Sequence, residues 1–136
     1  MIVDAHSHIF PSVNGIIGAG KTTSAGYGNI RVGDQTRRLF PAYNERTEYT
    51  VEMLIAHLDW AGVDKAVLLQ GTFYGECNVF VAEALARYPS RLIGALHADP
   101  WRTGYRSEFE TQLESGRFSA VKIEFSEKPG LSGLHP

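Results

Sequence analysis

The sequence predicts an α/β protein organised around a parallel sheet. Apolar runs typical of strands alternate along the chain with segments whose apolar residues recur at helical spacing. Glycine or proline follows most of these segments and marks their ends. Strands that are separated by helices pair in parallel through right-handed crossovers, so this order of elements predicts a layered α/β architecture.

The composition indicates one globular domain. The chain has 136 residues, 43% of them hydrophobic, and a formal net charge of -2, which gives no basic surface for nucleic acid. The lone Cys77 excludes an intramolecular disulfide and a cysteine metal cluster, and it favours a reducing compartment. Because neither a membrane-spanning run nor a secretory leader is visible, we expect a cytoplasmic protein with a small-molecule substrate.

The first strand carries the most specific chemical signal. Side chains alternate between the two faces of a strand, so His6 and His8 are expected on one face, with Asp4 one step behind them. Pro11 ends the strand just beyond. Neutral imidazole is the commonest protein ligand for Zn²⁺ and also suits iron, nickel and copper. The pattern therefore predicts that His6 and His8 bind one divalent metal.

A long segment, 12–49, separates this strand from the first helix. Its first part, Ser12 to Gly28, is rich in glycine and small polar residues and is interpreted as a long loop. Within it, Gly15 to Thr22 satisfies the phosphate-loop pattern G-x-x-x-x-G-K-[ST]. That pattern requires a helix at its end, and the following residues are poor helix formers. A flexible loop is the favoured interpretation, and a nucleotide site is the alternative.

The second part of this segment predicts a hairpin. Two short strand-like runs, 29–32 and 38–40, flank the turn residues of 33–36. We therefore expect 12–49 to be an insertion, a loop plus a hairpin, rather than part of the main sheet.

Helical spacing begins at Thr50, a candidate N-cap, and stops at Gly62. His57 lies beside the apolar stripe and is interpreted as a partly exposed helix residue. A strand buried on both faces is predicted at 64–70, and a helix at 78–88. The helix stripes contain the following apolar residues: Val51, Leu54, Ile55 and Leu58, then Val81, Ala84, Leu85 and Tyr88.

The last three elements follow the same alternation. A near-continuous apolar strand is predicted at 92–98, and a weaker helix at 105–115 with Phe109 and Leu113 inward. A fourth strand is predicted at 120–125.

Polar side chains cluster at the carboxyl ends of the predicted strands. In a parallel sheet that edge carries the loops that build active sites. The residues in question are His6 and His8, Gln70, His97 and Asp99, and Lys122 and Glu124.

Three blocks together resemble the amidohydrolase superfamily: IVDAHSHIFP at 2–11, AGVDKAVLLQ at 61–70, and YPSRLIG at 88–94 followed by Asp99 and Pro100. More narrowly, they resemble the amidohydrolase-related branch, which contains aminocarboxymuconate-semialdehyde decarboxylases, resorcylate decarboxylases and lactonases. The resemblance implies a (β/α)₈ barrel whose first strand supplies His6 and His8 to a divalent metal, zinc being the leading choice.

The resemblance also implies that residues 1–136 are incomplete. In the family, a histidine from strand five and an aspartate from strand eight complete the site, and the chain shows neither. A full barrel needs roughly 250 residues. The chain therefore resembles the N-terminal half of a TIM-type barrel, about four β/α units forming a single partial domain.

Four further residues are candidates for roles at the same site. Lys122 and Glu124 share one face of the fourth strand and are candidate catalytic residues, although a strand-end lysine and an inward polar side chain are the plainer interpretations. His97 and Asp99 are candidate substrate contacts, with hydrogen bonding in the loop before Pro100 as the alternative.

These residues predict a metal-dependent hydrolase of a lactone, amide or related carbonyl bond. A metal-dependent non-oxidative decarboxylase of the same branch is nearly level with it, and an inactive truncated fragment is the third interpretation. An unpaired edge strand predicts self-association or a missing C-terminal half. Other barrels with a His-x-His strand, namely TatD-like nucleases and histidinol-phosphatase-type phosphoesterases, are a further alternative. The mildly acidic charge argues against a nucleic-acid substrate.

Overall fold

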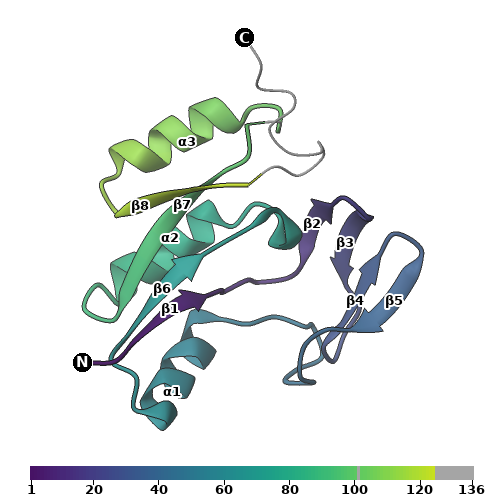
Figure 1. Cartoon of the computed structure of the whole chain (residues 1–136), viewed down its shortest axis with the longest axis horizontal. Helices are drawn as coiled ribbons and strands as arrows, with labels where there is room; N and C mark the ends of the chain where they lie inside the picture. The colour runs from purple at the N-terminus through teal and green to yellow at the C-terminus, as the bar shows by residue number, and fades with distance from the viewer. Residues whose placement is uncertain (101, 125–136) are drawn as a thin grey trace.

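A computed structural model describes residues 1–100 and 102–124, which form two four-stranded sheets and three α-helices (Figure 1). The main sheet has the order β1-β6-β7-β8, and every neighbouring pair is parallel. The predicted α/β class with a parallel sheet is confirmed. Over the described residues the sheet is open, with β1 and β8 at its edges. Its strands are β1 (Val3–Ser7), β6 (Lys65–Leu69), β7 (Leu92–Ala98) and β8 (Ala120–Ile123).

Helix α1 (Val51–Ala61) has the ends that the sequence predicts. The hydroxyl of Thr50 accepts a hydrogen bond from the backbone N–H of Met53 at 3.4 Å, so it satisfies one of the free donors at the helix start. Gly62 ends the helix in the left-handed conformation with φ 67°, which costs a residue without a Cβ little.

Helices α2 (Asn78–Arg87) and α3 (Tyr105–Glu114) differ in how well they are buried. Helix α2 buries Val81, Ala84 and Leu85, as its spacing predicts. The inward placement of Leu113 on α3 is wrong, because this side chain is 52% exposed and Phe109 is only half-buried. Few elements lie over α3, since β8 beside it is an edge strand.

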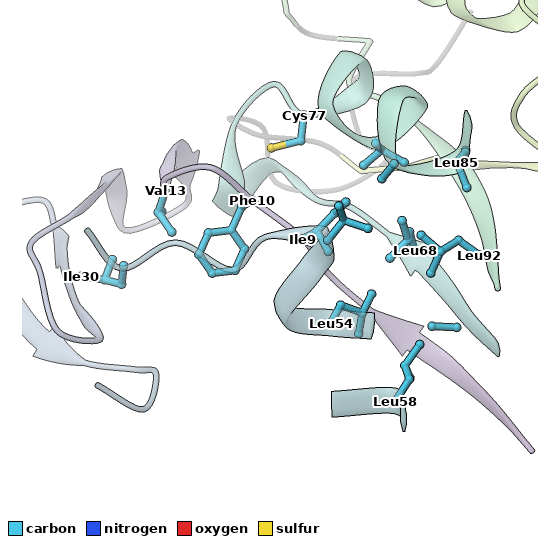
Figure 2. Packing of buried hydrophobic residues seen from close by; sticks show 14 residues of the cluster. Ile9, Phe10, Val13, Ile30, Leu54, Leu58, Leu68, Cys77, Leu85 and Leu92 are labelled. Atoms are coloured by element: carbon cyan, nitrogen blue, oxygen red, sulfur yellow. The ribbon is translucent and has the colours of Figure 1, made fainter. Parts of the chain in front are cut away.

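The hydrophobic core lies between the parallel sheet and helices α1 and α2. Figure 2 shows Leu68 of β6 beside Leu92 of β7, with Leu54 and Leu58 of α1 below them and Leu85 of α2 above, and all five belong to one cluster. Only one face of β6 is fully covered: Ala66 and Leu68 are buried, whereas Val67 and Leu69 are half-buried. The prediction of a strand buried on both faces therefore holds for the helix-facing side alone.

The insertion forms an antiparallel sheet of order β2-β3-β4-β5, which lies beyond the carboxyl ends of β1 and β6 (Figure 1). The interpretation of residues 12–28 as a loop is wrong, because β2 and β3 pair residue by residue there. The expected hairpin of β4 and β5 forms, but its second strand is 35–38 and not 38–40, because the turn takes only Gly33 and Asp34. The strands are β2 (Asn14–Ile17), β3 (Gly20–Ser24), β4 (Asn29–Val32) and β5 (Gln35–Arg38).

The β2–β3 hairpin packs against η1 (Thr72–Tyr74), a short 3₁₀ turn after β6. The hydroxyl of Thr22 donates to the carbonyl of Phe73 at 2.7 Å and accepts from the N–H of Gly15 at 3.1 Å. A Cβ at Gly15 would lie 1.9 Å from the carbonyl oxygen of Thr72, so only glycine permits this approach. The glycine and threonine of the phosphate-loop pattern therefore dock a hairpin, and the alternative of a nucleotide-binding strand–loop–helix is wrong.

Candidate functional site

His6 and His8 lie side by side at the carboxyl end of β1. Their ring centroids are 4.9 Å apart with an angle of 67° between the planes. His6 is exposed and His8 is half-buried. The register of β1 against β6 shifts between Asp4 and Ser7. Asp4 accepts hydrogen bonds from the backbone N–H of His6 at 3.0 Å and from the Ser7 hydroxyl at 2.6 Å, so it holds the local backbone.

Burial keeps the imidazole of His8 neutral. Desolvation lowers the pKa of His8 to about 4, and the charges of His6 and Lys122 add to this effect. Among the described residues, Nδ1 of His8 is buried without a hydrogen-bond partner. A neutral imidazole with a free nitrogen is the form that ligates metals.

The side chain of Gln70 fixes the backbone directly after His8. Its Nε2 donates to the carbonyl of Ile9 at 2.6 Å, and its Oε1 accepts from the N–H of Ile9 at 3.2 Å. Both residues are fully buried. This amide replaces the strand-to-strand hydrogen bonds that end where β1 leaves the sheet. The sequence placed Gln70 at a strand end, but it could not show this pairing.

Asn78 has the same relationship to His97. Its Nδ2 donates to the carbonyl of His97 at 2.9 Å, and its Oδ1 accepts from the N–H of His97 at 3.0 Å. His97 is 6% exposed, burial lowers its pKa, and its Nε2 is buried without a partner within the described chain. Sequence reasoning missed Asn78, because a polar residue at a helix start is also typical of a helix cap.

Glu124 is held at the same edge by two side chains. Lys122 Nζ lies 2.8 Å from its Oε2, and the Thr72 hydroxyl donates to its Oε1 at 3.2 Å. Burial raises the pKa of Glu124, but Lys122 and Thr72 outweigh burial and leave the pKa below the ordinary value. The carboxylate packs on Gly71, where a Cβ would lie 2.5 Å from Oε2. Glu124 is therefore an ionised carboxylate in a fixed position.

The predicted site residues gather at one end of the sheet. The charges of Lys122 and Glu124 contribute to the pKa values of both His8 and His97, and Asp99 contributes to that of His97. Asp99 is 7% exposed and is the first residue after β7.

Two cavities adjoin this edge. The larger, of about 510 Å³, lies between the β2–β3 hairpin and the carboxyl ends of the strands, and its wall includes Lys21, Thr72, His97, Asp99 and Arg102. The smaller, of about 190 Å³, has His8 in its wall together with five aromatic rings, namely Phe10, Phe40, Tyr43, Tyr49 and Tyr74. Tyr74 lines both cavities.

A divalent metal would find two imidazoles here. The adjacent rings and the free Nδ1 of His8 fit metal ligation. Within residues 1–100 and 102–124, however, no three histidine, cysteine, aspartate or glutamate side chains are grouped closely enough to hold a metal ion. A catalytic zinc site uses three protein ligands, and His6 and His8 provide two possible ones.

We also compared the helices with the length and hydrophobicity of a membrane-spanning helix. None of those in the described part of the chain combines the length and the hydrophobicity needed to cross a bilayer.

Comparison with known proteins gives a likeness of fold. No family model matches the sequence, and no curated protein matches it. Among solved structures, the chain is similar to the crystal structure of a probable 2-pyrone-4,6-dicarboxylic acid hydrolase from Acinetobacter baumannii with citric acid bound. The TM-score is 0.50 and the identity is 24%, over 96% of this chain and 40% of that one. The chain thus spans less than half the length of a hydrolase whose fold it shares in part.

Proposed function

We propose that this chain carries the metal-binding corner of a hydrolase of the amidohydrolase type, which cleaves a lactone or a related carbonyl bond. The observation that supports this most directly is the pair of rings, His6 and His8, 4.9 Å apart at the carboxyl edge of a parallel sheet. The solved structure of similar fold is described as a probable hydrolase of a 2-pyrone, which is a cyclic ester, and this agrees with the proposal.

The cavity beside His8 supports a planar ring as the substrate. Its aromatic wall offers flat apolar surfaces on which a ring can stack, while His8 lies at its edge. Tyr74 connects this wall to His8, because the centroid of its ring lies 4.7 Å from that of His8 and 4.9 Å from that of Phe10.

A metal at His6 and His8, with zinc as our proposal, would supply Lewis-acid activation of the carbonyl group and of water. Residues of the chain itself would transfer protons and stabilise charge. Glu124 is an ionised carboxylate that can accept a proton, and Lys122 beside it carries positive charge that stabilises developing negative charge. His97, neutral and with a free Nε2, can donate or accept a hydrogen bond to substrate.

We propose in addition that the parallel sheet is half of a (β/α)₈ barrel. Two imidazoles are one ligand short of a catalytic zinc site, so the missing ligand would come from outside residues 1–124. Val121 and Ile123 are 47% and 62% exposed and lie on the face of β8 opposite Lys122, where an outer helix of a further β/α unit would cover them.

Metal binding by the purified chain tests the central claim. In a Zn²⁺ titration of the purified chain, the affinity for zinc should fall sharply in His6→Ala and His8→Ala. It should stay unchanged in the control His57→Ala, which removes an exposed histidine on α1 whose Nδ1 is hydrogen-bonded to the Tyr49 hydroxyl. Equal zinc affinity in all four proteins would disprove the metal site.

Activity separates the chemical alternatives. When the chain is joined to a segment that supplies four further β/α units, we expect hydrolysis of a cyclic ester. Release of CO₂ from a carboxylated ring without ester cleavage would instead establish the decarboxylase. Full activity from the 136-residue chain alone would contradict the half-barrel.

A further inference from the structure

The larger cavity contains a cation that the proposed chemistry does not use. Lys21 occupies the lysine position of the phosphate-loop pattern, but it lies on β3 and lines the 510 Å³ cavity. No carboxylate of the described residues forms an ion pair with it. The side chain is exposed on a strand whose neighbour Thr22 is completely buried. The hairpin therefore presents Lys21 from a well-anchored position.

The anchoring is specific. Thr22 bonds to Phe73, and the backbones of Gly15 and Gly75 approach η1 and β2 so closely that a Cβ at either would clash. A Cβ on Gly75 would lie 2.2 Å from the carbonyl oxygen of Asn14. These contacts join the hairpin to the end of β6, so Lys21 and the strand ends face one cavity in a fixed relationship.

Hydrogen-bond donors remain available on the cavity wall, while its acids are largely compensated. Nη2 of Arg102 bonds to Glu76 and Glu108, each at 2.8 Å, which leaves the other guanidinium nitrogens for further acceptors. The charge of Asp99 acts on the same arginine. His97, more than nine-tenths buried, has its unpartnered Nε2 in a side chain that lines this cavity.

We propose that this cavity binds the oxyanion of a small ligand, a carboxylate or a phosphate, between Lys21 of the hairpin and Arg102 and His97 of the β7 end. Charge-assisted hydrogen bonds to an oxyanion would satisfy the unused donors, and the planar arginine fork matches either group. The inference rests on the proposed function only in making this oxyanion part of the substrate. The oxyanion site itself needs no metal.

The experiment measures binding of citrate, its neutral triamide and inorganic phosphate to the metal-free chain, by calorimetry and by backbone amide shifts. Citrate is the first probe because it carries several carboxylates in a small volume. Lys21→Met should weaken binding of the preferred oxyanion by about tenfold or more, the loss expected for one charge-assisted hydrogen bond. Lys65→Met is the matched control, because Lys65 lies at the opposite end of β6.

The outcomes are distinct. Binding of citrate or of phosphate that is lost in Lys21→Met and kept in Lys65→Met supports the site, and the tighter probe identifies the oxyanion. Failure of both probes to bind, equal binding of the triamide, or equal affinities in the two variants would overturn it. Metal-free protein and the His6→Ala variant should bind the oxyanion as tightly as the wild type, so failure of the metal proposal leaves this result readable.

Discussion

Gln70→Met should destabilise the fold strongly, although it conserves side-chain volume. The wild-type amide makes two hydrogen bonds to Ile9, at 2.6 and 3.2 Å, and both residues are fully buried. Methionine fills the space but pairs with neither group. Each backbone group left unpaired in the interior costs about 1 to 3 kcal/mol, so with two such groups the free energy of unfolding should fall by about 2 to 6 kcal/mol.

The chain provides a matched control for this substitution. Gln112→Met on α3 makes the same chemical change, but Oε1 of Gln112 is buried and accepts no hydrogen bond from the described residues. Removal of the Gln112 amide should therefore change the free energy of unfolding by less than about 0.5 kcal/mol or should stabilise the protein.

Urea denaturation followed by circular dichroism measures both variants. Because Ile9 directly follows His8, the Gln70 variant should also bind zinc more weakly than the wild type at a temperature where it remains folded. Equal urea midpoints for Gln70→Met and Gln112→Met would refute the reasoning that the amide of Gln70 stabilises the end of β1.

Two further predictions concern charged groups near the site. Gly71→Ala should displace the carboxylate of Glu124 from Lys122 and Thr72, so its pKa, followed by carboxyl ¹³C titration, should rise towards the ordinary value; an unchanged pKa would contradict the packing on Gly71. Burial raises the pKa of Glu76 to about 7, so the folded state holds this proton more tightly than the unfolded state, and stability should fall as pH rises from about 5 to 7. Glu76→Gln should remove about 1 kcal/mol of this pH-dependent loss of stability, a value kept low because solvent screens a side chain that is 31% exposed. Profiles of unfolding free energy against pH that run parallel for wild type and variant would refute the prediction.

The sequence predicted correctly those elements whose limits depend on residues close together in the chain. Helix α1 begins after Thr50 and ends at Gly62 because a hydroxyl cap and a glycine stop act within one turn of the chain. The parallel pairing of β1, β6 and β7 follows from alternation with helices. The adjacency of His6, in β1, and His8, directly after it, depends on positions two apart in the chain, so the sequence was enough to place them together.

The sequence predicted wrongly those features whose structure depends on contacts between residues far apart in the chain. Residues 12–28 are poor in apolar side chains, yet they form β2 and β3 because the hairpin docks on η1, some fifty positions away, through Thr22 and Phe73. Leu113 follows helical spacing but stays exposed, because no described element packs over it.

By itself, the sequence determined the α/β class, the order of helices and strands, and the pair of histidines that end the first strand, since each is set by neighbours along the chain. Only the tertiary structure decided that Gln70 and Asn78 pair with the backbones of Ile9 and His97, and that Lys21 faces a cavity with Arg102. The physical reason is that the role of a buried amide or of a cation without an ion-pair partner depends on the groups that it contacts, and these groups lie far away in the sequence.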